Sequence, residues 1–428
     1  MSDQLQSKNP LKRLAASLRE LRERHEERHR PSGFGFAFAD RVDYLDRQCW
    51  DELARPGSIF LGRDVLRTIE RHGPENITPR YALIFREEKP VAALAAQIVS
   101  VTGKHLRRED KIARENPSKN FLRRTISPVT RAASANLRDR LLVAGNLLSW
   151  GFHGIAFAPD EDPAVLWPGV AEALYRIRRA ERLTGETNLV LVKDLTPRET
   201  EPDALRRFSY RPLTTEPNMV LSLNDSWRTY EDYLAALDAK YRRNAKDQLK
   251  KLTAAGCTIE QLTDLTNHAS RLHELYLAVH GNASVRLVTL PEHFLPALGN
   301  TLKENFRCTV VRRGEQILGF VTSLRDGETA IAYYIGFDRA AAAEGLPIYL
   351  RLLHSTIGDA LAWRCKRISL GRTALEPKAS LGGKPEPMFV WMRHRLPTMN
   401  WLLRGVLGAV PHAEVPERNP FKATSATQ

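Results

Sequence analysis

Three short apolar segments, a helical pattern and a fourth apolar segment follow one another in the second half of this chain, and that order constrains the fold more than any other feature. Residues 308–312, 316–324 and 328–337 are separated by short glycine-containing turns, which predicts an antiparallel meander. Residues 346–361 carry apolar side chains at steps of three and four, as a helix requires. Residues 366–370 then read as a strand beside the meander.

The first half repeats this order at residues 80–86, 90–100, 140–150, 164–184 and 187–193. The repetition predicts an α+β fold of two tandem modules, each with a mixed, mostly antiparallel central sheet flanked by helices. The order of elements matches between the halves, whereas few residue identities do. The alternative is therefore one large α+β domain whose strands merely recur.

The composition is that of a globular protein, since 428 residues with 43% hydrophobic content are enough for two or three buried cores. No apolar run approaches the length of a membrane span and the first ten residues are polar, so we expect a cytoplasmic protein. The cysteines, Cys49, Cys257, Cys308 and Cys365, stand singly. We expect no disulfide and no metal site.

The formal net charge of +14 is concentrated in three segments. Residues 1–30, 101–140 and 240–251 carry excesses of +3, +7 and +5. Clustered positive charge favours an anionic partner such as tRNA, a nucleotide cofactor, anionic lipid or an acidic glycan. The alternative is that the charge serves only solubility.

The chain divides into four predicted regions. Residues 1–30 form a basic amphipathic helix that ends at a Pro-Ser-Gly sequence. Residues 35–211 form the first module, with a basic insertion over 101–138, and a proline-rich connection leads to the second module over 219–410, the expected catalytic domain. Residues 411–428 read as a tail.

This arrangement resembles the GNAT acyltransferase superfamily, specifically its double-domain branch that includes the Fem-type peptidoglycan aminoacyltransferases. The resemblance depends on an ordered set of segments: the helix containing residues 232–244, the sequence Tyr-Tyr-Ile-Gly-Phe-Asp at 333–338 that closes the meander, the helix after it, and residues 370–378. It implies acyl transfer by direct attack of an amine on a thioester or ester.

The resemblance also implies where the acyl donor binds. The donor would lie where two central strands separate, beside the third meander strand, with its pyrophosphate at the following helix N-terminus, whose free N–H groups attract anions. One departure concerns the phosphate loop, which has alanines and Glu344 where closely spaced glycines are usual. The donor-binding candidates are Tyr333, Ile335, Phe337, Arg339, Gly345 and Arg372.

Glu376, Lys378 and Tyr334 are the catalytic candidates. Glu376 and Lys378 follow a strand end, where a carboxylate beside a lysine can accept the amine proton while the cation stabilises the oxyanion. Tyr334 can donate a proton to the leaving group. The alternatives are a surface ion pair for the two charged residues and a core position for Tyr334.

Acceptor binding is assigned to two places. A glycine-rich sequence of the first module, 145–154, contains Asn146, Trp150 and His153, and its glycines indicate close backbone approach. His280 ends a helix at the front of the second module, where it either lines the acceptor groove or interacts with the helix dipole.

The function predicted is N-acyl transfer, acetyl or longer, from acyl-CoA as co-substrate to an amine on a small molecule or an envelope precursor, without a metal. One alternative is a Fem-type enzyme that takes its group from aminoacyl-tRNA, which would use the basic segments and lose affinity steeply with salt. Another is a degenerate, non-catalytic binding module. A weaker expectation is peripheral contact with anionic membrane at its inner face through residues 1–30.

Overall fold

The structure is a computed structural model that describes residues 19, 22, 26, 30–102, 138–196, 202–281, 286–400 and 418–422. The predicted helix over 1–30, the insertion over 101–138 and the tail over 411–428 fall almost wholly outside these residues. Within the described part, no helix is both long enough and apolar enough to cross a membrane. The same residues contain no group of three His, Cys, Asp or Glu side chains suited to a metal ion.

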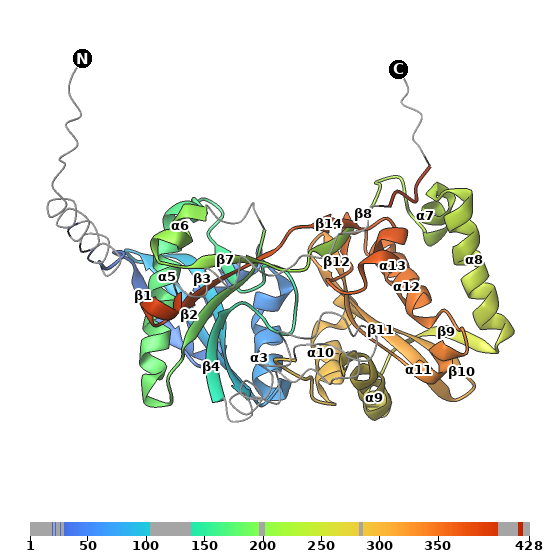
Figure 1. Cartoon of the computed structure of the whole chain (residues 1–428), viewed down its shortest axis with the longest axis horizontal. Coiled ribbons are helices and arrows are strands. Elements are labelled where there is room, and N and C mark those ends of the chain that lie inside the picture. The colour runs from blue at the N-terminus through green and yellow to red at the C-terminus, as the bar shows by residue number, and fades with distance from the viewer. Residues whose placement is uncertain are drawn as a thin grey trace, which may run out of the picture.

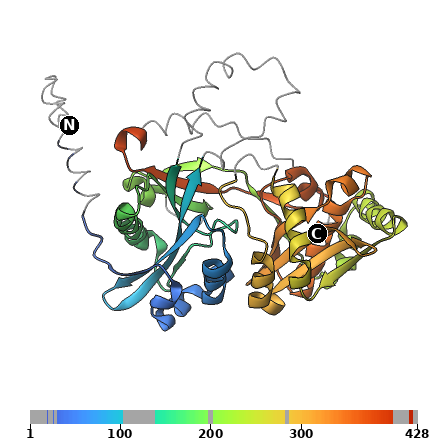
Figure 2. The ribbon, with the colours of Figure 1, turned by 90° about the horizontal axis from the view of Figure 1, so that it is seen from below.

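Two sheets lie side by side along the long axis of the molecule (Figure 1). The first has the strand order β1-β2-β3-β4-β6-β15-β7, and β5 pairs with β3. α5 packs on one face of this sheet, and α2 and α3 lie on the other (Figure 2). The elements of the first half are β1 (Gly35–Ala39), α2 (Arg47–Ala54), α3 (Arg63–His72), β2 (Ile77–Arg86), β3 (Lys89–Thr102), β4 (Arg138–Ala144), β5 (Ile155–Phe157), α5 (Pro163–Ala180), β6 (Leu189–Leu195), α6 (Pro202–Arg207) and β7 (Arg211–Thr214).

The second sheet has the strand order β14-β8-β13-β12-β11-β10-β9. α9 and α10 cover one face, and α7, α8 and α12 cover the other. Its elements are β8 (Asn218–Ser222), α7 (Tyr230–Ala236), α8 (Ala239–Ala254), β9 (Cys257–Leu262), α9 (Ala269–His280), α10 (Phe294–Leu302), β10 (Phe306–Arg313), β11 (Gln316–Asp326), β12 (Thr329–Phe337), α11 (Arg339–Ala343), α12 (Ile348–Ala362), β13 (Arg367–Ser369), α13 (Leu375–Ser380) and β14 (Lys384–Glu386).

The two halves share one topology, which confirms the predicted duplication. In the first, β2, β3 and β4 pair antiparallel and β4 pairs parallel with β6 after α5. In the second, β10, β11 and β12 pair antiparallel and β12 pairs parallel with β13 after α12. Each parallel pair needs a crossover, and a helix supplies it in both modules.

One strand crosses between the modules. β15 (Phe389–His394) follows β14 of the second sheet but inserts between β6 and β7 of the first, antiparallel to both. Trp391 of β15 is buried in the core of the first module. Residues 389–394, which the sequence analysis grouped with the second module, therefore complete the first sheet.

Local signals in the sequence explain where several helices begin. The Asp162 side chain accepts a hydrogen bond from the backbone N–H of Ala164 and Pro163 is the first residue of α5. Thr229 and Asp232 form a reciprocal capping box at the start of α7. These caps fix α5 against the first sheet and α7 beside α12.

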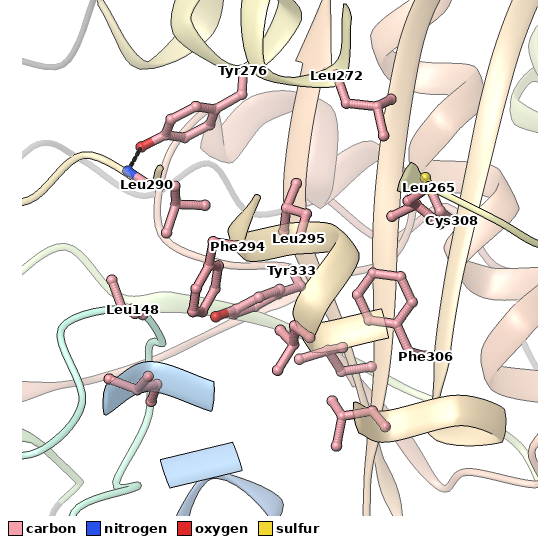
Figure 3. Close-up of a cluster of buried hydrophobic side chains, with 14 of the residues drawn as sticks. Leu148, Leu265, Leu272, Tyr276, Leu290, Phe294, Leu295, Phe306, Cys308 and Tyr333 are labelled. Carbon is pink, nitrogen blue, oxygen red and sulfur yellow. Dashed lines mark hydrogen bonds between the residues drawn. The ribbon is translucent and has the colours of Figure 1, made fainter. Parts of the chain in front are cut away.

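A hydrophobic core shared by both modules joins them. Phe60, Val143 and Leu148 of the first module belong to the same buried cluster as Phe294 and Tyr333 of the second. Figure 3 shows Leu148, carried by the loop after β4, close to Phe294 of α10 and Tyr333 of β12. The loop that carries the predicted acceptor residues is thus held against the central strand of the second module.

Candidate active site between the modules

The two central strands of the second sheet pair over only three residues. β12 and β13 are matched from Thr329 to Ile331 and from Arg367 to Ser369. β12 then continues to Phe337, whereas the chain beyond β13 turns at Gly371, which has a φ of +84°. A non-glycine residue adopts such a φ only with strain, so glycine suits this turn. The strands therefore part beside residues 332–337, as the resemblance led us to expect.

The turn at Gly371 is held by an asparagine from β8. The Asn218 side-chain oxygen accepts hydrogen bonds from the Ser369 hydroxyl and from the backbone N–H of Gly371, each at 3.1 Å. The backbone N–H of Met219 donates to the Gly371 carbonyl at 3.1 Å. These bonds fix the start of the segment that leads to Lys378.

Trp150 reaches from the first module to this turn. Its indole N–H donates to the Ser369 hydroxyl at 3.1 Å. A Cβ atom placed on Gly371 would lie 3.3 Å from the Trp150 ring and 3.5 Å from Lys378 Nζ. Trp150 and Lys378 therefore approach the same glycine, one from each module.

Lys378 is a buried amine on α13, with 3% of its surface exposed. Burial lowers the pKa of Lys378 to about 7, although the nearby Glu216 carboxylate acts in the opposite direction. Among the described residues Lys378 forms no ion pair. An amine in this state exchanges a proton near neutral pH and can act as a base or, once protonated, as a cation.

A β-bulge explains why two adjacent tyrosines face the same way. The pairing of β11 with β12 shifts between Val321 and Ser323, and the Thr322 hydroxyl bonds to the backbone N–H and carbonyl of Tyr334 instead, at 2.9 and 3.2 Å. Neighbouring side chains of a regular strand point to opposite faces, but the Tyr333 and Tyr334 rings lie 4.5 Å apart. The bulge thus aims both rings at the first module.

These tyrosines lie between Trp150 and α9. The Trp150 ring centroid is 5.9 Å from that of Tyr333 and 6.3 Å from that of Tyr334. The Tyr334 hydroxyl donates to the Leu148 carbonyl at 3.4 Å. Burial raises the pKa of Tyr334 well above its usual value, so its phenol stays protonated and remains a proton donor.

A buried ion cluster ties the second module to the first. The Asp194 carboxylate, with no exposed surface, accepts hydrogen bonds from Arg372 at 2.8 Å and from the Gly151 backbone at 3.1 Å, and it contacts Lys193. Burial would raise the pKa of Asp194, but Lys193 and Arg372 outweigh burial and hold it below its usual range. Arg372, predicted to bind the donor, is instead engaged in this contact between modules.

His153 lies at a second contact between the modules. Its Nδ1 atom is 3.1 Å from the Ser149 hydroxyl and its Nε2 atom is 3.7 Å from Asp326 at the end of β11. Asp326 also accepts hydrogen bonds from the Ser58 hydroxyl at 2.7 Å and the Ile59 backbone at 2.8 Å. Burial lowers the pKa of His153 to about 4, so the ring is neutral at pH 7.

Two predicted residues have local structural contacts. Asn146 is buried, and its side-chain oxygen accepts from the backbone N–H of Leu148 at 2.9 Å, which shapes the loop that carries Trp150. Glu376 is half exposed and pairs with Arg418 of the C-terminal segment. Glu376 and Lys378 lie two positions apart on α13 and so point to different sides of the helix, which corrects the expected pairing of these two side chains.

The segment that follows β12, where the phosphate loop was expected, does not form an open loop. Residues 339–343 form the short helix α11, whose first N–H groups bond to the Asp338 carboxylate. Asp338 also pairs with Arg271 at 3.1 Å. Arg339 is exposed and Gly345, with a φ of +86°, ends the turn after α11. A carboxylate therefore already caps α11, the short helix that precedes the helix N-terminus at which phosphate was expected.

Side chains of β12, α12 and α9 lie near the place where β12 and β13 part. Phe337 packs against Tyr349 at the start of α12, with ring centroids 5.9 Å apart, while Ile335 is half-buried. His280 stacks on Tyr276 at 4.9 Å, and its Nε2 atom lies 3.2 Å from the Thr289 hydroxyl. Tyr276 in turn contacts Tyr334 at 5.6 Å, which connects His280 to the tyrosine pair.

Sequence reasoning missed several residues of this site. Asn218 and Glu216 lie in the segment assigned to a proline-rich connection, although the Glu-Pro-Asn sequence could have indicated a turn. Asp194 follows Lys193 inside an otherwise apolar strand, and such a charge pair was a signal for a buried ion pair. Three clefts formed by the described residues lie elsewhere, and none of the three is lined by Tyr334, Lys378 or Arg372.

The duplicated topology, the parted central strands and the bulged strand define a tandem acyltransferase fold. Residues 239–379 match the family described as "Acetyltransferase (GNAT) domain". The second module therefore contains a GNAT-type acetyltransferase domain, and the first module repeats its topology. No curated protein sequence matches the chain.

Several solved structures are similar to the chain at low sequence identity. FemX is 10% identical with a TM-score of 0.50, and the match covers 86% of this chain and 99% of that one. A tandem GNAT protein from the clavulanic acid biosynthesis pathway is 12% identical with a TM-score of 0.48, covering 85% and 99%. L-PGS from Bacillus licheniformis is 12% identical with a TM-score of 0.42, covering 80% and 96%. Of these, the FemX comparison supports the fold.

Proposed function

We propose that this protein transfers an acyl group to an amine by direct attack, in the space between the modules where Lys378, Trp150 and Tyr334 converge. The observation that carries the proposal is the buried amine of Lys378, which has a pKa of about 7 and no ion pair among the described residues. A lysine buried only for structure would be expected to form a direct ion pair, because an unpaired cation is costly to bury, and the nearby Glu216 carboxylate forms no such pair with Lys378.

The proposed step is a balanced acyl transfer. The nitrogen lone pair of the acceptor attacks the donor carbonyl carbon, and the carbon–sulfur or carbon–oxygen bond to the leaving group breaks. Neutral Lys378 accepts the proton that the amine loses, while the Tyr334 phenol donates to the leaving sulfur or oxygen. A base whose pKa lies near the working pH suits this task.

For the donor we propose an acyl-CoA, acetyl or longer. Among the residues that the structure describes, no strand pairs with Ala332 to Phe337 of β12 on the β13 side, so these backbone groups are available to the amides of an extended donor. The N-terminus of α12, which has no side-chain cap, offers N–H groups to a pyrophosphate. Ile335 and Phe337 border this route.

Aminoacyl-tRNA is the second candidate donor, and one observation favours it. Asp338 caps α11 with a negative charge and Glu344 follows it, so phosphate is repelled where a CoA-binding loop would attract it. An aminoacyl ester at an RNA 3′ end needs no such loop. The exposed cations of α8, among them Lys240, Arg243 and Lys246, offer contacts for an RNA backbone.

The acceptor is proposed to approach from the first module. Trp150 and the loop shaped by Asn146 and His153 form that wall, while His280 lies beyond Tyr276. The acceptor class is an amine on a small molecule or an envelope precursor. A cytoplasmic location belongs to the same proposal.

The test compares donors directly. Purified protein is incubated with acetyl-CoA, longer acyl-CoAs or aminoacyl-tRNA, with hydroxylamine as a surrogate amine, and the hydroxamate is measured for wild type and Lys378→Gln. We expect one donor class to give product and the variant to lose about a hundredfold or more. Product from tRNA that falls steeply between low and physiological salt would select the second donor. Hydroxamate is counted above a blank without protein, because hydroxylamine also cleaves these donors by itself. No product above the blank with any donor, or full activity of Lys378→Gln, would overturn the proposal.

A further inference from the structure

A separate cleft opens at the end of the second sheet where β9 and β11 end and β10 begins. It has a volume of about 720 Å³ and lies between the end of β9, the last turn of α10 and the start of β10. Lys378, Trp150 and Tyr334 are not among the residues that line it. We call it the β9–β10 cleft. Its apolar floor is formed by Leu262, Leu265, Pro296, Phe306 and Trp363.

The walls of the β9–β10 cleft are predominantly cationic. Lys303, Arg307 and Arg325 line it, against one carboxylate, Glu304. Lys303 and Arg325 are exposed, and neither forms an ion pair with any residue that the structure describes. A concave surface with this balance concentrates anions.

The third cation is held rigidly. Arg307 donates to the buried Asp359 carboxylate at 3.1 Å, and its guanidinium lies 4.8 Å from the centre of the Trp363 ring. Gln261 donates to the same Asp359 oxygen at 2.9 Å, while the Trp363 indole N–H donates to the Glu304 carbonyl at 3.0 Å. The plane of the guanidinium is therefore fixed, which prepares it for a two-point contact with a carboxylate or phosphate.

Backbone strain marks the same place. α10 ends at Lys303, whose φ of 48° and ψ of −117° are unfavourable for any residue other than glycine. Glycine is the usual residue at such a helix end, yet this position holds a cation that lines the cleft. Strained non-glycine residues concentrate at ligand sites.

We propose that the β9–β10 cleft binds a small organic anion that combines a phosphate or carboxylate group with a compact, flat apolar body. The anionic group meets Arg307, Arg325 and Lys303, and the apolar body covers the floor beside Phe306 and Leu265. A volume of about 720 Å³ lies within the range of small-molecule sites. The inference is independent of the acyl-transfer proposal, because none of these residues lies in the site between the modules.

The test is calorimetric titration of the full chain with phenyl phosphate, compared with inorganic phosphate, which lacks the ring, and benzyl alcohol, which lacks the charge. We expect saturable binding of phenyl phosphate that is tighter than that of either part. Arg325→Gln and Arg307→Lys should each weaken it about tenfold. Arg307→Lys keeps a cation beside Asp359, so the fold is expected to persist, and a thermal melt verifies this.

A matched control is Arg243→Gln, which removes an exposed arginine from α8, outside the cleft. It should leave phenyl phosphate binding unchanged, and so should Lys378→Gln. The proposal is overturned if no probe binds saturably, if inorganic phosphate binds as tightly as phenyl phosphate, or if binding survives both cleft variants. Each of these results would mean that the β9–β10 cleft is a charged surface and not a specific ligand site.

Discussion

At the scale of single residues, the burial of Lys378 lowers the stability of the folded protein, although it also gives the amine the pKa that the proposed base needs. Its pKa is 10.5 in an unfolded chain and about 7 in the folded protein. As the pH falls from 10.5 to 7, Lys378 binds a proton in the unfolded state but not in the folded state, so the free energy of unfolding declines. Below pH 7 this decline is complete. At about 1.4 kcal/mol per pH unit, the loss at neutral pH is on the order of 5 kcal/mol.

Lys378→Met should therefore separate stability from activity. We expect acyl transfer to fall about a hundredfold, while the melting temperature at pH 7 rises by a few degrees and the fall in stability from pH 10 to pH 7 becomes shallower. Thermal melts across this pH range, with Lys250→Met on the exposed face of α8 as control, measure both effects. A variant that melts lower than wild type at pH 7 would contradict the buried, neutral amine.

Because His153 is buried as a neutral ring, we expect the stability of the protein to decrease in acid. The pKa of His153 falls from 6.5 in the unfolded chain to about 4 in the fold because of burial, while Asp326 and Asp194 favour protonation and Lys193 opposes it. The stability that a neutral ring contributes is full above pH 6.5 and is lost toward pH 4, at up to about 1.4 kcal/mol per pH unit.

His153→Gln should flatten that slope between pH 6.5 and 5, as measured by urea unfolding at successive pH values. His354, whose pKa burial lowers to about 3, should leave a similar slope in the variant. The exposed His293→Gln serves as the control. An unchanged slope in His153→Gln would show that the ring is already accessible to solvent.

At the scale of elements, periodicity predicted the repeated strands of each module and the crossover helices α5 and α12, while β1, β9, β15 and the short elements near the site were missed. Residues 339–345 resembled an altered phosphate loop, yet consecutive alanines favour a helix once Asp338 caps it. Residues 375–380 were placed after a strand end without a predicted secondary structure, whereas they form α13, with Pro377 in its first turn, where proline is tolerated. Glu376 and Lys378 were paired for that reason.

Other parts of the site depended on contacts between distant segments, which local patterns do not contain. The glycines of residues 145–154 did indicate close backbone approach. They could not indicate that Trp150 would meet Ser369 and Gly371 of the other module. Arg372 was recognised as important, but its partner Asp194 lies 178 positions earlier in the sequence.

The cap of α11 provides a prediction about the donor. Asp338→Ser keeps a residue that can cap the helix but removes the negative charge. If a CoA pyrophosphate approaches α11, affinity for CoA should increase about two- to fivefold, because helix-end charges contribute roughly 0.3–1 kcal/mol. Calorimetric titration with CoA measures this, and Asp264→Ser, which removes an exposed carboxylate outside α11, is the control. Unchanged affinity would place the pyrophosphate elsewhere or favour the tRNA donor.

At the scale of the whole molecule, two features make the modules interdependent. The buried cluster that includes Phe60, Leu148, Phe294 and Tyr333 draws on both modules, so neither can expose it to water without loss. β15 fills the position between β6 and β7, and the first sheet is therefore incomplete without a strand from the second half of the chain. The shared core and β15 together therefore fix the geometry of the site between the modules.

Removing β15 should accordingly unfold the first module. A fragment of residues 30–214 lacks the strand between β6 and β7, which leaves two unpaired edges and the pocket of Trp391 open. We expect this fragment to be aggregated or unfolded by circular dichroism and size-exclusion chromatography. Joining residues 386–400 to its C-terminus through a flexible linker should restore a folded, monomeric species. The same fusion carrying Trp391→Asp should fail, since a carboxylate would be buried in that core. A stably folded 30–214 fragment would instead show that β15 only docks on a complete module, and the connection through the shared core would then have to hold the site by itself.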